Sequence, residues 1–323
     1  MNFEIDDQQR DFAASIDAAL SAADVPGAVR AWGDGDTAPG RKVWAQLTDL
    51  GVAALLVPEK FDGIDASPVD LVVALERLGY WAVPGPVTES IAVAPILLAD
   101  DPRAAQLASG ELIVTVAMPP QVPRAVNADV AGLTLLATDG AVSDATVGTA
   151  HDSVDPARTL FDVTASGDTG ATDTTRAYEF GVLATAAQLV GAGQAMLDRS
   201  VEYAKQRTQF GRTIGSYQAI KHKLADVHIA VELARPLVYG AALALANQND
   251  GVVSADTARD TSAAKVASAE AALLAARSAL QTHGAIGFTQ EHDLSLNLLR
   301  VQALRSAWGD PSVHRRRLLE VLP

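Results

Sequence analysis

The stretch IKHKLADVHIAVELARPLV, residues 220–238, carries the strongest structural signal in this chain of 323 residues. Its apolar side chains recur after four and then three residues, which places them along one face of an α-helix. The members of this stripe are Ile220, Leu224, Val227, Val231, Ala234 and Val238. Pro236 lies inside the pattern, so we expect the helix to kink or to end early there.

The segments on either side of this helix have a similar character. Residues 182–207 and 257–285 alternate small and apolar side chains over lengths typical of long helices. Alanine, the strongest helix former, is abundant in both segments. Because the connections between the segments are short, we predict an antiparallel helical bundle over residues 173–323.

Residues 1–110 also have the pattern of helices. The apolar segment 69–78 follows Ser67 and Pro68, which are typical of the N-cap and the first turn of a helix. We expect Gly79 to lie just past the end of this helix, since glycine often terminates helices. The pattern predicts an N-terminal helical domain over residues 1–110.

The middle of the chain, residues 111–172, differs from both flanks. It contains short segments rich in Val, Thr and Leu that are separated by turns, many of them with glycine. These segments are residues 112–117, 133–138, 141–145 and 159–163. Residues 167–175 have the composition of a polar linker. We therefore predict a small antiparallel β-unit here, and a mostly α fold in which this unit joins the N-terminal helical domain to the C-terminal bundle.

The composition excludes several classes of function. A formal net charge of −14 argues against nucleic-acid binding, which needs a basic face. The chain has no cysteine, so disulfides, thiolate catalysis and Cys-ligated zinc are excluded. His222, His228 and His283 lack metal-ligand spacing, so we expect no metal site. The N-terminus is polar and acidic, and the apolar runs at 50–58 and 91–99 are too short to cross a bilayer, so we expect a cytoplasmic protein without a membrane partner.

Three strings in the C-terminal half carry the functional signal. They are YAKQRTQFGR from Tyr203, SYQAIKHKLAD from Ser216 and QTHGAIGFT from Gln281. Together, in this order and at this separation, they resemble the acyl-CoA dehydrogenase family. The segments LGVAALLVPEKFDG (50–63) and ALERLGY (74–80) are similar to the opening helical domain of that family. The resemblance covers nearly the whole chain and is weakest in the β-unit.

In that family FAD lies at a subunit interface, and the resemblance implies roles for residues of the first string. Arg207 would pair with the pyrophosphate of a flavin whose ring sits mostly in the neighbouring subunit. A planar guanidinium suits this role because it forms bidentate, charge-assisted bonds with phosphate oxygens. Phe210 would pack against the cofactor, and Gly211 would permit a tight exit from the helix.

The second and third strings supply the rest of this expected half-site. The resemblance implies that Gln218 and Gln281 hydrogen-bond adenosine or ribityl groups of FAD, and that Gly284 lets the backbone approach the phosphates. The family's usual Gly-Gly pair is Gly284-Ala285 here, so one additional methyl group stands at the phosphate site.

The acid that the family uses for chemistry is not at its usual place. A carboxylate must take the α-proton of the acyl-CoA thioester, and a positioned base contributes roughly 10²–10⁴-fold to the rate. The family carries this glutamate in a Tyr-Glu-Gly-Thr string, where this chain reads AWGDP over residues 307–311. The glutamate position falls on Trp308 or Gly309, neither of which accepts a proton. A second position used by some members, counted back from Arg207, falls on Gly181.

Two nearby carboxylates are candidates for a relocated base. Asp310 lies one or two residues after the expected glutamate and is followed by Pro311. Glu179 lies two residues before Gly181, about 200° around a helix axis. The alternative for both residues is a solvated or capping carboxylate.

The expected cradle for the flavin ring is also altered. Active members follow their first β-strand with a Thr-Glu-Pro-x-x-Gly-Ser-Asp loop, whose hydroxyl and backbone N–H groups serve the ring and the substrate. Residues 118–123 of this chain read MPPQVP, and three prolines there lack N–H donors. No Lys-x-Trp-Ile-Thr-Asn string follows in the β-unit.

A retained grip for the tail of FAD without a base or a ring cradle indicates a division of labour between subunits. The resemblance implies the non-catalytic subunit of a heteromeric, α2β2 acyl-CoA dehydrogenase of the kind that oxidises steroid-derived acyl-CoA in actinobacteria. Its catalytic partner would hold most of the acyl-CoA substrate. The alternatives are a self-sufficient homo-oligomeric dehydrogenase with a relocated base, and an inert assembly scaffold that does not contact cofactor.

Overall fold

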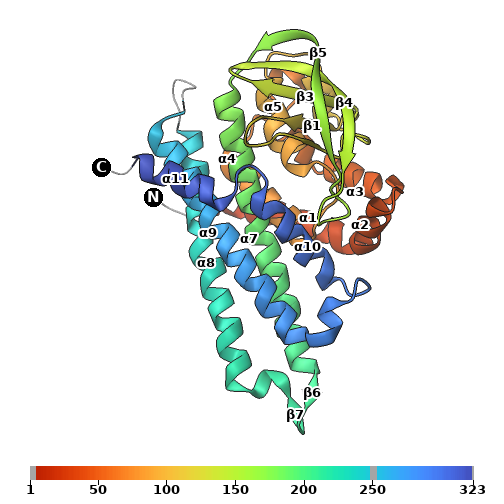
Figure 1. Cartoon of the computed structure of the whole chain (residues 1–323), viewed down its shortest axis with the longest axis vertical. Helices are drawn as coiled ribbons and strands as arrows, with labels where there is room; N and C mark the ends of the chain where they lie inside the picture. The colour runs from red at the N-terminus through yellow and green to blue at the C-terminus, as the bar shows by residue number, and fades with distance from the viewer. Residues whose placement is uncertain (1–4, 248–252, 322–323) are drawn as a thin grey trace.

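The structure is a computed structural model that describes residues 5–247 and 253–321. A small β-sheet lies at one end of a set of long helices, and the short β6–β7 hairpin lies at the opposite end (Figure 1). The N-terminal helices pack beside the long helices at the end nearer the sheet (Figure 1). The mostly α class and the order of helical, β and helical parts are confirmed, whereas the domain borders at 110 and 172 stay a prediction.

The N-terminal part contains four main helices followed by shorter turns. The helices are α1 (Asp7–Ala22), α2 (Val25–Gly33), α3 (Ala38–Asp49) and α4 (Pro68–Tyr80). Short helical elements follow or lie between them: η1 (Val52–Ala54), η2 (Glu59–Phe61), the π-helical η3 (Thr88–Val93), α5 (Ala94–Leu97) and α6 (Ala104–Ala108). Helix α4 begins as expected, because Ser67 and Asp70 form a capping box.

The predicted end of α4 is wrong, and the reason is packing. Helix α4 continues through Gly79 to Tyr80. A Cβ atom on Gly79 would lie 2.2 Å from the backbone oxygen of Gln188 in α7. On the facing helix, a Cβ on Gly191 would lie 1.9 Å from the backbone oxygen of Glu76. The two glycines therefore let α4 and α7 approach closely, which fastens the N-terminal helices to the bundle.

The sheet has five strands in the order β1-β3-β4-β5-β2. They are β1 (Val114–Ala117), β2 (Ala125–Val126), β3 (Leu133–Thr138), β4 (Ala141–His151) and β5 (Leu160–Ala171). Strands β1 and β3 pair in parallel, whereas the other pairs are antiparallel. The prediction of a purely antiparallel unit is therefore wrong. The linker predicted at 167–175 is also wrong, because β5 continues to Ala171 and the next helix begins at Thr174.

The C-terminal part is built on three long helices and two shorter ones. They are α7 (Thr174–Gln206), α8 (Gln218–Ala246), α9 (Ala255–His283), α10 (Leu294–Ser306) and α11 (Pro311–Val321). The smaller elements are β6 (Thr208–Gln209), β7 (Arg212–Thr213), η4 (Ile214–Ser216) and η5 (Gly284–Phe288). The apolar stripe of α8 faces the core from Leu224 to Val238, as expected, but the helix does not end near Pro236.

Helices α7 and α8 are long and apolar enough, by length and composition alone, to pass a test for membrane spans. In α7, 94% of the apolar window is buried inside the molecule, and in α8 the buried share is 39%. The runs at 50–58 and 91–99 are therefore not the most apolar stretches of the chain. Helix α7 lies at the centre of the bundle, where α4, α8, α9 and α10 all contact it. A helix that is buried on all sides is apolar on all sides, which explains the composition of α7.

Candidate functional site

The two positions at which the family carries its catalytic base lie against each other in this structure. Trp308 is 1% exposed, and its indole ring covers Gly181 in α7. A Cβ atom on Gly181 would lie 2.2 Å from Cε3 of Trp308, so no larger side chain fits there while the indole is present. The indole Nε1 donates a hydrogen bond of 3.0 Å to Oε1 of Glu89. Indole therefore fills the space between the two positions.

A buried lysine holds the loop that carries Trp308. Lys265 in α9 is fully buried and donates to the backbone oxygens of Leu304, Arg305 and Gly309 at 3.3, 2.9 and 3.2 Å. Burial lowers the pKa of Lys265 to about 7, opposed by the negative charge of Asp310. The ammonium group caps the C-terminal end of α10, where the helix dipole favours a cation.

A histidine and a tyrosine complete the support of this loop. His314 Nε2 lies 2.9 Å from the backbone oxygen of Trp308, and its Nδ1 lies 3.2 Å from Oγ of Ser262. Tyr178 donates to the same backbone oxygen at 3.3 Å. Burial lowers the pKa of His314 to about 4, so the imidazole is neutral near pH 7 and donates from one nitrogen. Trp308 is therefore held by backbone contacts as well as by its own packing.

Glu179 is buried and is held by two other side chains. The side chain is 1% exposed, and Oε1 accepts from the guanidinium of Arg317 while Oε2 accepts from Oγ1 of Thr261. Burial raises the pKa of Glu179, although Arg317 opposes this shift. The residue lines a cavity of about 290 Å³ beside Tyr178, but each of its oxygens already has a partner.

Asp310 caps a helix. Its Oδ1 accepts from the backbone N–H of Ser312 at 2.8 Å, in the first turn of α11. This hydrogen bond is the main cause that lowers the pKa of Asp310. A carboxylate that is stabilised in its ionised form is a weak proton acceptor, so the capping alternative describes this residue.

The proline-rich segment after β1 forms a turn whose two ends are joined by backbone hydrogen bonds. The backbone N–H of Met118 donates to the oxygen of Val122 at 2.6 Å, and the N–H of Val122 donates back at 3.0 Å. Pro119 and Pro120 lie between them. The backbone donors at both ends of this turn are thus used within the turn.

The first string of candidate cofactor residues lies at the far end of the bundle. Arg207 follows the last residue of α7 and is exposed, as are Phe210 and Gly211 in the β6–β7 hairpin. Phe210 and Gly211 have φ angles of 53° and 80°, as the two central residues of a type I′ turn require. Phe210 is 92% exposed at the tip. The chain therefore presents a large apolar side chain beyond the end of the bundle.

The remaining candidates lie on neighbouring helix ends. Gln218 is the first residue of α8, and Gln281, in the last turn of α9, accepts from the amine of Lys223. Gly284 ends α9 with a φ of 64° and a ψ of −137°, and no atom lies within 4 Å of the place where its Cβ would be. The open backbone at Gly284 is accessible to a ligand.

An aromatic stack joins the two sides of this end. His283 stacks on Tyr203 with ring centroids 4.4 Å apart, and His292 meets His283 edge-on at 5.2 Å. Since Tyr203 lies one turn before Arg207 and His283 precedes Gly284, the stack fixes the end of α7 against the end of α9. Sequence reasoning gave these rings no such role, because nothing in their spacing indicates that they touch.

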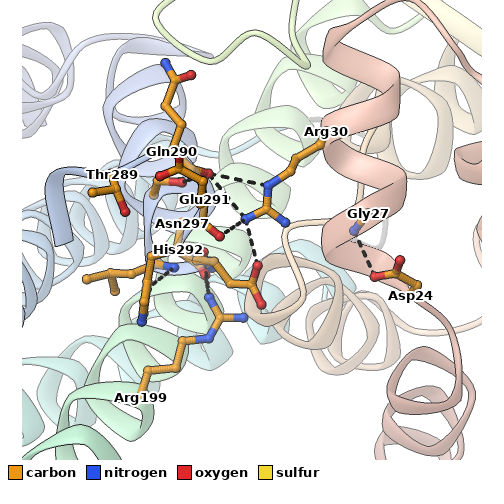
Figure 2. Close-up of polar contacts among 12 residues, drawn as sticks. Asp24, Gly27, Arg30, Arg199, Thr289, Gln290, Glu291, His292 and Asn297 are labelled. Atoms are coloured by element: carbon orange, nitrogen blue, oxygen red, sulfur yellow. Dashed lines mark hydrogen bonds and ion pairs between the residues drawn. The ribbon is translucent and has the colours of Figure 1, made fainter. Parts of the chain in front are cut away.

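Two arginines hold the segment that follows Gly284, and they were also missed. Figure 2 shows Arg30 and Arg199 reaching the 289–297 segment from different elements. Arg30 donates to the backbone oxygen of Glu291 at 3.1 Å and to Oδ1 of Asp293 at 2.8 Å. Arg199 donates to the backbone oxygen of Asp293 at 3.0 Å. Through Arg30, helix α2 thereby contacts the segment beside the candidate cofactor residues, over sequence separations of 261 and 263 residues.

The structure brings the candidate cofactor residues together and separates them from the candidate base positions. Arg207 lies 26 positions after Gly181, both on or directly after α7. At a rise of about 1.5 Å per residue, this corresponds to roughly 39 Å along the helix. The candidate cofactor residues therefore lie far from the base position of this chain.

Comparisons with known proteins agree in family and in fold. A model of the acyl-CoA dehydrogenase C-terminal domain matches residues 168–322, and one of the N-terminal domain matches residues 6–100. Acyl-CoA dehydrogenase IpdE2 of Mycobacterium tuberculosis is 32% identical over 306 residues, which cover 91% of this chain and 90% of that protein.

Solved structures share the fold at lower identity. A chain of the ChsE4-ChsE5 complex from Mycobacterium tuberculosis superposes with a TM-score of 0.85 and 23% identity, and all of both chains is covered. The butyryl-CoA dehydrogenase of Megasphaera elsdenii gives a TM-score of 0.82 and 18% identity, with 99% of each chain covered.

Proposed function

This chain belongs to the acyl-CoA dehydrogenase family, and from that premise we propose that it is the non-catalytic subunit of a heteromeric, α2β2 acyl-CoA dehydrogenase in the cytoplasm. The partner subunit supplies the base, the cradle of the flavin ring and most of the acyl-CoA site. This chain supplies contacts to the tail of the partner's FAD. The contributing residues are Arg207, Phe210, Gly211, Gln218, Gln281 and Gly284.

The observation that carries this proposal is the separation of the two ends of α7. The candidate cofactor residues gather at an exposed end of the bundle, roughly 39 Å along the helix from the position of the base. A flavin that Arg207 contacts therefore lies far from the base position of this chain, which supports a ring seated against another polypeptide. This geometry supports a shared site, in which each chain serves a cofactor centred on its neighbour.

The residues at the exposed end fit the tail of FAD. Among the residues that the structure describes, no carboxylate pairs with Arg207, so its guanidinium is available for a pyrophosphate. Gly284 leaves its backbone open where a Cβ would otherwise stand. Phe210 offers an apolar surface that is 92% exposed. When bound, FAD supplies the hydride acceptor of the reaction, and the residues of this chain bind and orient its nucleotide part.

The state of the catalytic end supports the non-catalytic part of the proposal. The two base positions of the family hold Trp308 and Gly181, so neither carries a carboxylate. The indole of Trp308 also covers Gly181. Glu179 has both oxygens engaged, and Asp310 is used as a helix cap. A general base needs a free lone pair directed at the substrate. Both carboxylates already have structural partners, which weighs against the self-sufficient alternative.

The acyl group that we propose is a bulky, steroid-derived one. A relevant structural relative is the Tcur3481-Tcur3483 steroid acyl-CoA dehydrogenase, with a TM-score of 0.83 and 19% identity over 97% of each chain. The proposal also keeps three domains, with borders at residues 110 and 172. Where only one of two equivalent sites is used, its pocket can widen at the expense of the other.

The proposal is tested by the flavin content of the complex. The chain is co-expressed with catalytic family members of the same organism that keep a glutamate in the loop equivalent to 307–310, and each purified complex is assayed for FAD and subunit ratio. We expect one FAD for each catalytic subunit and none for this chain purified alone. Arg207→Ala should lower FAD affinity about 10- to 100-fold, from loss of a charge-assisted bond of roughly 1.5–3 kcal/mol.

Two further variants make the test specific. Arg207→Lys keeps the charge without the bidentate geometry and should fall between wild type and Arg207→Ala. Arg316→Ala removes an exposed arginine of α11, far from the hairpin, and should leave FAD content unchanged. One tightly bound FAD per subunit in a homo-oligomer of this chain would contradict the division of labour. Unchanged FAD content in Arg207→Ala would favour the inert scaffold.

A further inference from the structure

Helix α8 has a second apolar face, which points away from the core. The large side chains on this face are Ile229, Leu233 and Leu237, and their exposed fractions are 54%, 68% and 43%. They recur every four residues, so they lie in one row along the helix, which we call the exposed ridge. Figure 1 shows α8 on the outer side of the bundle, with α9 beside it. The exposed ridge therefore lies on the outer surface of the chain.

The composition of α8 is that of a buried helix. Both α7 and α8 contain a window apolar enough to pass a test for membrane spans, yet the buried share of that window is 94% in α7 and 39% in α8. Helix α8 thus has the composition of the central helix of the bundle without its burial. Contiguous exposed apolar surface of this kind is typical of a contact surface, because water covers it at a cost in free energy.

The charged residues of this part of α8 lie away from the exposed ridge. Residues 229–244 include two of them, Glu232 and Arg235. Arg235 follows Leu233 by two positions, about 200° around the helix axis, and its guanidinium pairs with Glu76 in α4 and with Glu232 at 3.2 Å. The chain has a formal net charge of −14, so two copies repel each other in general. An uncharged face is where a second copy can approach with the least repulsion.

Helix α9 extends this apolar face sideways. The amine of Lys223 in α8 donates to Gln281 in α9, which sets the level of these two antiparallel helices. Seven residues away from that contact, two turns along each helix, Ala230 lies level with Leu274, whose side chain is 38% exposed. The face is roughly 22 Å long from residue 229 to 244 and about 20 Å wide across both helices. Its plan area of about 440 Å² is around half of the ~800 Å² that each partner buries in a stable interface, so it suits the apolar centre of one.

We propose that the exposed ridge packs against the same ridge of a second copy of this chain, across a two-fold axis at Leu233. A two-fold axis brings one patch against itself, so an antiparallel crossing of two α8 helices places Ile229 of one copy opposite Leu237 of the other. Contacts between identical chains are more apolar than other interfaces, as this face is. The inference rests on the proposed function for the number of copies: an α2β2 assembly holds two copies of this chain, and its catalytic partner occupies the hairpin end.

Disulfide cross-linking tests the position of the axis. The chain has no cysteine, so one introduced cysteine reports on one position. In the assembled complex under mild oxidation, Leu233→Cys should link two copies of this chain, because residues on the axis come within the ~4.4–6.8 Å between Cα atoms that a disulfide needs. Ile229→Cys should link at least about 10-fold more slowly, since Leu237 is its counterpart across the axis. Leu319→Cys is the matched control, because Leu319 is 69% exposed but lies on α11, and it should give no linked pair.

A charge placed on the ridge tests its contribution to assembly. Leu233→Lys changes an exposed side chain, so the chain itself should fold as before. In sedimentation experiments on the complex, we expect it to weaken the association of the two halves of the assembly by at least about 100-fold, because two uncompensated ammonium groups would meet at the axis. Leu319→Lys is the control for an added exposed charge and should leave the assembly intact. An intact assembly in Leu233→Lys would overturn the inference.

The cross-linked products and the flavin content identify what covers the ridge. Cross-links from Leu233→Cys to the catalytic subunit would assign the ridge to that partner and overturn the inference. Binding of the complex to phosphatidylcholine vesicles that is lost in Leu233→Lys would assign the ridge to a membrane and overturn it equally. Arg207→Ala should lose flavin and keep the cross-link between two copies, whereas Leu233→Lys should keep flavin, so the proposed function and this inference can fail separately.

Discussion

Replacement of Trp308 measures how firmly the family's base position is filled. The side chain is 1% exposed and lies against Gly181, so Trp308→Ala removes a fully packed indole and leaves a cavity. Such changes cost about 3–5 kcal/mol. The change also removes the donor to Oε1 of buried Glu89, which adds about 1–3 kcal/mol for an unsatisfied group. We therefore expect a loss of about 4–8 kcal/mol in the free energy of unfolding.

Trp308→Phe separates the two contributions. A phenyl ring keeps most of the packing over Gly181 and loses the N–H, so we expect a loss of about 1–3 kcal/mol. The matched control is Trp44→Phe, because the indole of Trp44 is also buried but donates to a neutral acceptor, the backbone oxygen of Pro84, at 2.8 Å. That control should cost about 0.5–1.5 kcal/mol.

The assay is urea unfolding of the assembled complex at fixed subunit concentration, followed by far-ultraviolet circular dichroism. FAD content is measured before unfolding and should not change in either Trp308 variant, because Arg207 lies at the other end of α7. A loss below about 1 kcal/mol for Trp308→Ala would refute the tight packing described above. Equal losses for Trp308→Ala and Trp308→Phe would mean that the hydrogen bond to Glu89, not packing, dominates.

Three more predictions concern elements that position the site. The folded-state pKa of Lys265 is about 7, below its unfolded value of about 10.4, so the unfolded chain binds more protons between these values. The free energy of unfolding should therefore rise by up to ~1.4 kcal/mol per pH unit from pH 7 towards pH 10. Urea titrations at several pH values measure this slope, and Lys265→Met should lack it. Gly191→Ala should separate α4 from α7, because its Cβ would lie 1.9 Å from the oxygen of Glu76, and hydrogen exchange should then increase in α4. Ser67→Ala should cost about 1 kcal/mol through loss of the α4 capping box, as read from urea midpoints, and a stabilising effect would disprove the cap.

The sequence predicted the elements whose signals are local. The stripe of α8 was visible because its burial follows helical spacing, and the start of α4 was visible because Ser67 and Pro68 are typical of an N-cap and a first helical turn. The end of α4 was not, because Gly79 serves the contact with Gln188, more than a hundred residues away. Local reading assigns a glycine to a turn, whereas a helix–helix contact can require the same residue.

The sheet was predicted less well, for two physical reasons. The parallel pairing of β1 with β3 needs a crossover, and here β2 and turns take the place of the usual helix, so the segment resembled hairpins. The end of β5 is exposed from residue 167 to 171, although residues 169–171 pair with residues 141–143 of β4. Such a segment lacks the apolar alternation that marks a half-buried strand, and residues 167–171 therefore had the composition of a linker.

In the candidate site, too, the local features were predicted and the long-range contacts were not. The family strings identified residues that the structure gathers at one end, and they identified Trp308 and Gly181 as altered positions. That these two residues touch is a tertiary fact, because 127 positions separate them. The supports from Lys265 and from Arg30 are equally non-local. Their roles followed from the fold and could not be read from spacing.

The length of α7 also bears on how such a subunit arises. After a gene duplication, mutations that abolish the chemistry at one position of a helix need not disturb a second position roughly 39 Å further along it, and selection can act on the two positions separately. A copy that loses its own reaction is still retained if its neighbour depends on it to keep a coenzyme. Substitutions at the former catalytic position are then not limited by the selection that preserves the cofactor-binding residues.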